Sequence, residues 1–287
     1  MALSKVFFAC DYMKNIQEKL KINKDISSFA EEGYVLVSLP DQSSVKSVRR
    51  RLNDKLSEIM GQKFNLEDYH QYIQNDDQHI EIHLEMLMFL HETELYLKVL
   101  AENKTVLVSL IGPDIDVQVC PHLRIARPGK PQDNIGFHCD IDYGNTSHEM
   151  SCITALTDLN EAGAVKVLPA SHARPRMQTV AVVNDKAPKG SKLHRLGVPY
   201  SYKRIVDEGY KENMVPVPMK IGQALCFDLG VIHGQEVNNS SDTRWSIDVR
   251  LKNILAPTNT REGYYKSFSK SPLTEAAEKY LENNKNS

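Results

Sequence analysis

The sequence lacks any hydrophobic run long enough to cross a membrane, and it carries little net charge. No apolar stretch approaches the ~20 residues that a membrane helix needs. Lys5 and Asp11 confine the apolar N-terminus to a few residues, too short for a secretory signal. The formal net charge of -2 disfavours a general nucleic-acid binder. We therefore expect a cytoplasmic protein that binds neither membranes nor nucleic acid.

Cysteine is also scarce, and its spacing carries no motif. The five residues are an odd number without a close pair, which disfavours a zinc knot or a redox motif. They are Cys10, Cys120, Cys139, Cys152 and Cys226. Four of them lie in apolar, strand-like segments, so we expect small buried side chains in a reducing compartment.

The chain is long enough to bury a sizeable core. It has 287 residues, of which 41% are hydrophobic and 25% charged, which is ordinary for a globular protein. No internal repeat, low-complexity tract or linker divides it. We therefore expect a single domain over residues 1–287.

The first third, residues 1–104, has mainly helical patterning. A short helix precedes a turn at Gly33 and a strand over residues 34–39. Residues 45–60 have apolar positions at helical spacing, with Ser43 or Ser44 as the candidate cap. Residues 79–103 predict one long helix with a single apolar stripe.

From residue 105 the pattern changes to short segments rich in β-branched residues and punctuated by Gly, Pro and Asn. The expected strands begin with "TVLVSL" at residues 105–110 and end with "WSIDVRLKNIL" at 245–255. Many short strands favour a double-sheet sandwich or barrel. We expect an α+β protein with a mainly β core over 105–260, buttressed by the N-terminal helices. Residues 261–287 return to a helix, with Ser271 as a candidate cap.

One short stretch, "GFHCDIDYG" at residues 136–144, carries the strongest chemical signal. His138 and Asp140 are two residues apart, so on a strand they would share a face. Taken alone, such a pair is more often a satisfied hydrogen bond than a metal site. His233 follows about ninety residues later at an expected strand start. Two imidazoles and one carboxylate leave three positions of an octahedral ion open, as in non-haem Fe(II) oxygenases.

The next strand supplies a candidate anchor for a chelating cosubstrate, for which we expect 2-oxoglutarate. Arg244 lies eleven residues after His233, and a guanidinium matches a carboxylate bidentately. Ser246 and Arg250 share its face, while the opposite face is apolar. The polar face must meet water or a polar cavity. Arg244 with Ser246 is the expected cosubstrate site, and Arg250 is the alternative anchor.

Several other polar residues have more than one interpretation. Gln118, His122 and Arg124 alternate before the metal motif, and we expect at least one of them, Gln118 or Arg124 among the candidates, to lie near the cosubstrate. Asp142 is a spare ligand, a substrate contact or a turn former. His172 has a structural role or contacts substrate at the rim.

His79 and His83 are four residues apart on the long predicted helix, a spacing that could chelate a metal. No third ligand accompanies them in the sequence. We therefore expect exposed helix residues rather than a second metal site.

These motifs together resemble the phytanoyl-CoA dioxygenase family of Fe(II)/2-oxoglutarate oxygenases. The resemblance covers "FAEEGYVLVSL", "GFHCDIDYG", "ITALTDLNEAGAVKVLPASH" and "IHGQEVNNSSDTRWSIDVRL". It implies a double-stranded β-helix (jelly-roll, cupin-like) core, ferrous iron on His138, Asp140 and His233, and 2-oxoglutarate on Arg244. The sequence departs from the family at Phe137, where Trp is frequent, and at Ala170, where Gly is frequent.

The expected function is therefore oxidative: a 2-oxoglutarate-dependent dioxygenase that hydroxylates a small molecule, in a natural-product tailoring step, with O2 consumed and ascorbate helpful in vitro. The rival interpretations are a metal-dependent cupin-like hydrolase or isomerase without 2-oxoglutarate, and a non-catalytic metal-binding relative. Residues 173–215 lie between two expected core strands and are predicted to form a substrate lid. From Arg174 to Arg204, an excess of Lys and Arg over a single acid, Asp185, favours an anionic substrate.

Overall fold

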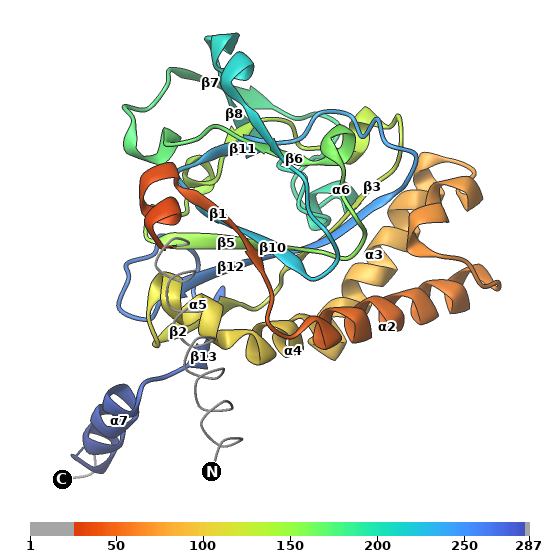
Figure 1. Cartoon of the computed structure of the whole chain (residues 1–287). Coiled ribbons are helices and arrows are strands. Elements are labelled where there is room, and N and C mark those ends of the chain that lie inside the picture. The colour runs from red at the N-terminus through yellow and green to blue at the C-terminus, as the bar shows by residue number, and fades with distance from the viewer. Residues whose placement is uncertain (1–25, 285–287) are drawn as a thin grey trace, which may run out of the picture.

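The computed structural model describes residues 26–284, and its first part is mainly helical (Figure 1). Residues 26–32 are helical, and strand β1 follows at Tyr34–Ser38. The helices after it are α2 (Gln42–Met60), η1 (Leu66–Tyr72), α3 (Asp76–Thr93), α4 (Leu95–Glu102) and α5 (Lys104–Ile111). The helical part therefore extends to residue 111, and the strand predicted at 105–110 is wrong.

Two local predictions in this part also need correction. The helix predicted over 79–103 is broken at Glu94, whose φ of 48° is left-handed and cannot continue a right-handed helix. The cap of α2 is Asp41, whose carboxylate accepts from the backbone N–H groups of Ser43 and Ser44 at 3.0 and 3.1 Å. The two serines are thus capped residues rather than the cap.

The remaining chain is mostly antiparallel strand. The strands are β2 (Ile115–Gln118), β3 (His122–Ala126), β4 (His138–Cys139), β5 (Glu149–Ala155), β6 (Val165–Val167), β7 (Thr179–Val183), β8 (Ser201–Ile205), β9 (Val215–Val217), β10 (Gln223–Asp228), β11 (Ile232–Gly234), β12 (Arg244–Asn253) and β13 (Tyr265–Ser269). Short helices between them are η2 (Pro131–Asp133), η3 (Asp140–Tyr143), η4 (Glu161–Gly163), η5 (Ser171–Ala173), α6 (Lys192–Arg195) and η6 (Glu208–Asn213), and α7 (Pro272–Asn284) ends the described chain. Strand β13 lies inside the range predicted to be only helical, so the sheet continues past residue 260.

The strands form two main sheets and one separate hairpin. The larger sheet has the order β1-β10-β5-β12-β2-β13, with β3 also paired to β12, and the smaller has the order β4-β11-β6-β9. Strand β12 is central: it pairs with β5 on one side, and with β3 and then β2 on the other. Strands β7 and β8 pair only with each other among the described strands.

The larger sheet has a different environment on each face. Side chains of β12 such as Trp245 and Val249 join the apolar cluster that α2, α3 and α4 cover (Figure 1). On the other face, Ile153 of β5 and Phe227 of β10 pack with Val167 of the smaller sheet. The space between the two sheets is where polar residues of β12 can converge with the smaller sheet.

The apolar segments of the chain contribute their side chains to these two clusters. Within residues 26–284, no helix is both long enough and apolar enough to span a membrane. Cys139, Cys152 and Cys226 are buried, as predicted, whereas Cys120 is exposed, contrary to the prediction. Cys10 lies outside the described residues.

Candidate metal centre and cosubstrate pocket

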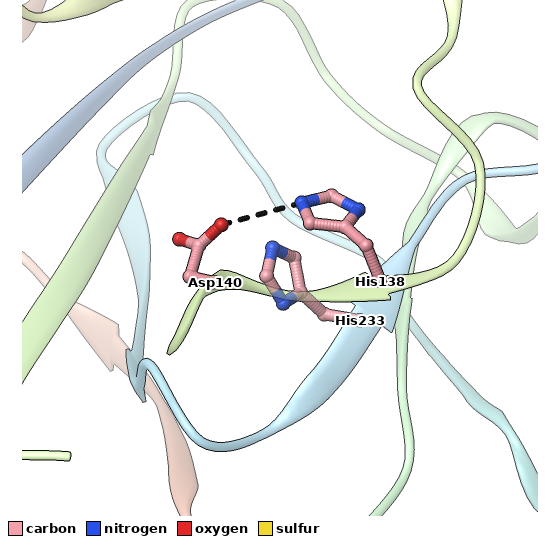
Figure 2. Close-up of side chains that lie close together, drawn as sticks. All are labelled: His138, Asp140 and His233. Carbon is pink, nitrogen blue, oxygen red and sulfur yellow. Dashed lines mark ion pairs between the residues drawn. The ribbon is translucent and has the colours of Figure 1, made fainter. Parts of the chain in front are cut away.

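Strand pairing in the smaller sheet brings the predicted metal ligands together. His233 of β11 lies directly opposite His138 of β4. Asp140 opens η3 immediately after the two-residue strand β4, so a turn rather than strand alternation directs its carboxylate. The three potential ligand atoms lie within 4.8 Å of one another, and the side chains point toward a common space (Figure 2).

Backbone carbonyl groups fix which nitrogen of each imidazole can bind a metal. Nδ1 of His138 donates to the carbonyl of Gly136 at 2.9 Å, and Nδ1 of His233 donates to the carbonyl of Val231 at 3.0 Å. A carbonyl oxygen only accepts, so Nδ1 carries the proton in both rings. In the neutral form of either ring, Nε2 is therefore the nitrogen that can bind a metal, the usual arrangement for a metal-binding histidine.

The electrostatics of the triad favour ligand-ready protonation states. Burial opposes ionisation of Asp140, but Arg250 and the two imidazoles outweigh it and hold the pKa of this carboxyl well below its usual range. Burial, followed by His138, lowers the pKa of His233 to about 4. At neutral pH the site therefore offers a carboxylate and a neutral imidazole, which are the forms that bind a divalent cation.

The close approach of β11 to the segment before β4 depends on a glycine that the sequence analysis did not single out. A Cβ at Gly234 would lie 2.3 Å from the carbonyl oxygen of Gly136, the same atom that accepts from His138. No side chain fits there without moving the first histidine. In the sequence, the only signal of this requirement is that a glycine directly follows His233.

The polar face of β12 opens onto a cavity of about 800 Å³ that also contains the triad. Its lining includes every alternate residue of the first part of β12, namely Arg244, Ser246, Asp248 and Arg250. The intervening residues of β12 lie in the apolar cluster on the helical side. The alternation predicted for this strand is therefore present.

Arg244 and Ser246 have buried polar atoms that the protein leaves without a partner. Among the described residues, Nε and Nη1 of Arg244 and Oγ of Ser246 make no hydrogen bond. Burial and the nearby Arg124 lower the pKa of Arg244 to about 9. A buried guanidinium without a counter-ion is costly, so these atoms fit an anionic group such as a carboxylate.

The other two predicted cosubstrate residues also line this cavity. Arg124 lies opposite Ser246 across the β3–β12 pair, and its Nη2 is 3.7 Å from a carboxylate oxygen of Asp248. Gln118 is committed to the backbone: its Nε2 donates to Cys120 O at 2.8 Å and its Oε1 accepts from Arg250 N at 3.0 Å. Arg124 thus faces the Arg244 end, while Gln118 shapes the wall.

Arg250, the alternative anchor, has a different partner. Its Nη2 lies 3.0 Å from Oδ2 of Asp140, and its Nη1 donates to the hydroxyl of Tyr264 at 2.8 Å. Tyr264 lies just before β13, in the part of the chain for which the sequence predicted no site residue. Arg250 is therefore paired with the candidate metal ligand Asp140 rather than free to bind a cosubstrate carboxylate.

The remaining polar residues now have defined places. Asp142 lines the cavity but forms ion pairs with Arg176 and with Lys203, the latter at 3.5 Å, so it links η3 to the β7–β8 region. His172 donates to the carbonyl of Ala30 at 3.2 Å and lies against Gly33. Neither residue belongs to the triad.

The prediction that His79 and His83 are exposed is wrong. Both lie on the buried face of α3, where Nε2 of His83 donates to Leu123 O at 2.7 Å and Nδ1 of His79 is 2.9 Å from the hydroxyl of Tyr69. Burial lowers the pKa of His79 to about 4 and that of His83 to about 3. They are neutral core side chains.

The two departures from the family pattern have structural explanations. Ala170 has a φ of 56°, a left-handed conformation that glycine adopts more easily. Phe137 packs edge-on against Tyr210, with ring centroids 6.2 Å apart, and lies in a small apolar cluster away from the triad. Both positions support the backbone around the site and leave the ligands unchanged.

The fold and the site together define a class of protein: a mainly antiparallel β-sheet protein in which two histidines and one carboxylate form a candidate metal site beside a cavity lined by arginines. The chain belongs to the phytanoyl-CoA dioxygenase family, which it matches over residues 29–246. This is a family of Fe(II)- and 2-oxoglutarate-dependent enzymes, and a candidate site for each of these cofactors is present here. None of the curated proteins compared with the chain matches it in sequence.

Solved structures with the same fold are only distantly similar in sequence. The apo form of the non-heme monooxygenase ThoJ has a TM-score of 0.55 at 15% identity, covering 86% of this chain and 84% of its own. The epimerase SnoN, in a complex with Fe3+, alpha ketoglutarate and nogalamycin RO, has a TM-score of 0.52 at 11% identity, covering 87% and 99%. EvdO2 from Micromonospora carbonacea var. aurantiaca has a TM-score of 0.50 at 14% identity, covering 84% and 94%. These likenesses establish the fold.

Proposed function

We propose that this protein is an Fe(II)- and 2-oxoglutarate-dependent dioxygenase that hydroxylates a small molecule, in a tailoring step of natural-product biosynthesis. We also propose that its two sheets form a double-stranded β-helix of the jelly-roll, cupin-like type. One observation carries the proposal: the partnerless buried atoms of Arg244 and Ser246 open onto the same cavity as the triad. A metal alone would not require them.

The triad suits ferrous iron. His138 and His233 supply neutral nitrogen donors and Asp140 supplies the only anionic one, which leaves three positions of an octahedral ion open. Bound Fe(II) would supply the activation of O2 that accompanies the oxidative decarboxylation of 2-oxoglutarate to succinate and CO2. The protein's part is to hold the three donors and to balance the charge of Asp140 with Arg250.

The end of the cavity that is lined by Arg124, Arg244 and Ser246 suits the cosubstrate. We assign the distal carboxylate of 2-oxoglutarate to Arg244, with a further hydrogen bond from Ser246. Among the described residues, Arg124 forms an ion pair with Asp248 while Arg244 forms none, so this end carries an excess of positive charge. A dianionic cosubstrate neutralises that excess, whereas a hydrolase or isomerase would leave it uncompensated.

Hydroxylation is the default outcome for this chemistry in a site with a complete carboxylate ligand. Asp140 fills the position that a halide would need, so the triad argues against halogenation. SnoN, one of the proteins of similar fold, is an alpha ketoglutarate-dependent epimerase from nogalamycin biosynthesis. The occurrence of this fold in such a pathway supports small-molecule tailoring as the setting.

The test is succinate release from 2-oxoglutarate by purified protein with Fe(II), O2 and ascorbate, measured with and without candidate substrates. We expect metal-dependent succinate release that a true substrate accelerates, with one oxygen atom gained by the product. Substrate turnover with Zn(II) or Fe(II) but without succinate would identify the hydrolase or isomerase instead. Metal binding without any turnover would identify a non-catalytic relative.

We propose that residues 173–215 form the lid of the substrate cavity. They contain regular structure: β7 and β8 pair over Thr179–Val183 and Ser201–Ile205, and the connection between them contains α6. Residues 194, 195 and 197–200 of this connection line the cavity, together with Ser201 of β8. Leu196 is buried in the main core, so the cavity side of the lid is anchored while its outer part is exposed.

The charge of the lid is smaller than the sequence suggested, but it still favours an anionic substrate. Four of its cations form ion pairs: Arg176 and Lys203 with Asp142, Lys192 with Glu81 of α3, and Lys211 with Glu208. Arg195 lines the cavity and forms no ion pair within residues 26–284. We therefore propose Arg195 as the contact for an anionic group.

Limited proteolysis tests the lid. Trypsin is expected to cleave at the exposed Lys186 and Lys189 in the empty protein, and to do so several-fold more slowly once Fe(II), 2-oxoglutarate and substrate fill the cavity. The control is the C-terminal helix α7, whose exposed lysine Lys279 should be cut at the same rate in both states. Equal cleavage of the lid in the empty and filled protein would show that this segment does not close on ligand.

A further inference from the structure

Arg250 makes an unusually complete set of contacts with one ligand of the candidate metal centre. Its Nη2 and Nε lie 3.0 and 3.3 Å from the same oxygen, Oδ2 of Asp140. The other oxygen, Oδ1, lies 3.4 Å from Nε2 of His138. The two carboxylate oxygens thus have different partners: one is held by the guanidinium, and the other lies near the imidazoles.

The arginine is itself held from two sides. Nη1 donates to the hydroxyl of Tyr264 at 2.8 Å, and the backbone N–H donates to Oε1 of Gln118 at 3.0 Å. The side chains of Arg250 and Asp140 are only 13% and 4% exposed. A buried, fully engaged guanidinium has little freedom, so it can fix the orientation of its partner.

Arg250 and Arg244 share a face of β12 but serve different groups. They are six residues apart on the strand, which separates their Cα atoms by roughly 20 Å at ~3.3 Å per residue. Arg244 has partnerless atoms facing the cavity, whereas Arg250 is already paired with the carboxylate of the triad. One small cosubstrate does not need both.

We propose that Arg250 is the positioning residue of the metal centre: it holds Oδ2 of Asp140, so that Oδ1 alone faces the metal, and Tyr264 holds Arg250 in place. The inference rests on the proposed metal site. The last torsion of an aspartate side chain is soft, so an unheld carboxylate can rotate or offer both oxygens. Partners that orient a metal ligand typically change metal affinity by about 10- to 100-fold.

The test compares Arg250→Met, Arg250→Lys and Tyr264→Phe with the wild type. Affinities for Co(II), and for Fe(II) without oxygen, are measured by competition with a chelator. We expect Arg250→Met to bind both metals about 10- to 100-fold more weakly, Arg250→Lys to recover part of this loss, and Tyr264→Phe to lose less than Arg250→Met. The visible spectrum of the Co(II)-saturated protein should change in Arg250→Met and return toward the wild type in Arg250→Lys.

Arg127 provides a matched control. It is also a buried arginine, with Nε and Nη2 donating to Asp133 at 2.8 Å, but the triad is not among its partners. Arg127→Met should therefore lower the unfolding temperature without changing the Co(II) spectrum or the metal affinity. If Arg250→Met does not fold, Arg250→Lys and Tyr264→Phe decide the question.

Tighter rather than weaker metal binding by Arg250→Met would overturn the inference. If Arg250 acted only as a neighbouring positive charge, its removal would tighten the binding of a divalent cation. Unchanged or tighter metal binding by Arg250→Met, or an unchanged Co(II) spectrum, therefore contradicts the positioning role. Normal metal affinity with weaker binding of 2-oxoglutarate would make Arg250 a cosubstrate anchor. A wild-type protein that binds no metal would instead overturn the proposed metal site itself.

Discussion

Asp140→Asn is expected to weaken Fe(II) binding by at least about 100-fold, or roughly 2.7 kcal/mol, and to abolish succinate release. Asp140 is the only anionic donor of the triad, and it is buried beside both imidazoles. Asparagine has nearly the same shape, so the loss comes from the missing charge. The measurement is chelator competition with Fe(II) without oxygen, followed by succinate assay.

This substitution also breaks the buried pair with Arg250, which typically costs about 3–5 kcal/mol of folding stability. The double variant Asp140→Asn/Arg250→Met removes both charges, so it should regain part of the lost stability while still failing to bind the metal. Asp142→Asn is the control for acidity alone, because Asp142 pairs with Arg176 and Lys203 rather than with the triad. Fe(II) binding by Asp140→Asn at wild-type affinity would remove Asp140 from the ligand set.

Arg244→Met is expected to raise the concentration of 2-oxoglutarate needed for half-maximal activity by about 100-fold or more, with metal affinity unchanged. A buried carboxylate that loses its charged hydrogen-bond partner typically costs about 2–5 kcal/mol. Ser246→Ala removes one neutral donor and should cost only about 0.5–1.5 kcal/mol. The two constants are measured separately, with the metal saturating in the 2-oxoglutarate titration.

The same variant has a distinctive stability signature. Burial lowers the pKa of Arg244 to about 9 from its ordinary value of 12.5. For a base, a lowered pKa in the folded state means that the charged form destabilises folding. This cost is fully present below about pH 9 and diminishes as the pH rises from about 9 toward 12.5. At neutral pH, Arg244→Met should therefore unfold at an equal or higher temperature than the wild type when no ligand is added.

Addition of 2-oxoglutarate with metal should reverse this order, because a ligand stabilises only the form that binds it. The wild type is expected to gain unfolding temperature on addition and Arg244→Met to gain little. If Arg250→Met shows the larger 2-oxoglutarate defect and Arg244→Met shows none, the cosubstrate has been assigned to the wrong arginine.

Much of the fold could be predicted from local patterning, and the errors have local causes. The strand predicted at 105–110 is α5, because a short apolar run with β-branched residues is compatible with either element, and the neighbouring helices decide. The helix break at Glu94 could not be predicted, because neither glycine nor proline lies near it in the sequence. The exposure predicted for His79 and His83 is wrong because the buried face of α3 was inferred from apolar residues alone.

The candidate site also contains residues that the sequence could identify and contacts that it could not. Residue types and spacing were enough to select His138, Asp140, His233 and Arg244 as candidates, since few chemistries require these groups in this order. The contacts of Arg250 and Gly234 could not be predicted. One depends on an ion pair between residues 110 positions apart, and the other on two backbone segments that meet within van der Waals distance.

By itself, the sequence determined which side chains share a face of a strand, because alternation is a property of the backbone that needs no partner. It thereby determined the polar face of β12 and its apolar reverse. Only the tertiary structure decided which strands pair and in what register: His138 meets His233 through the pairing of β4 with β11, and the two sheets enclose the cavity. Register depends on contacts between distant segments, and a shift of one residue would turn the ligands away from each other.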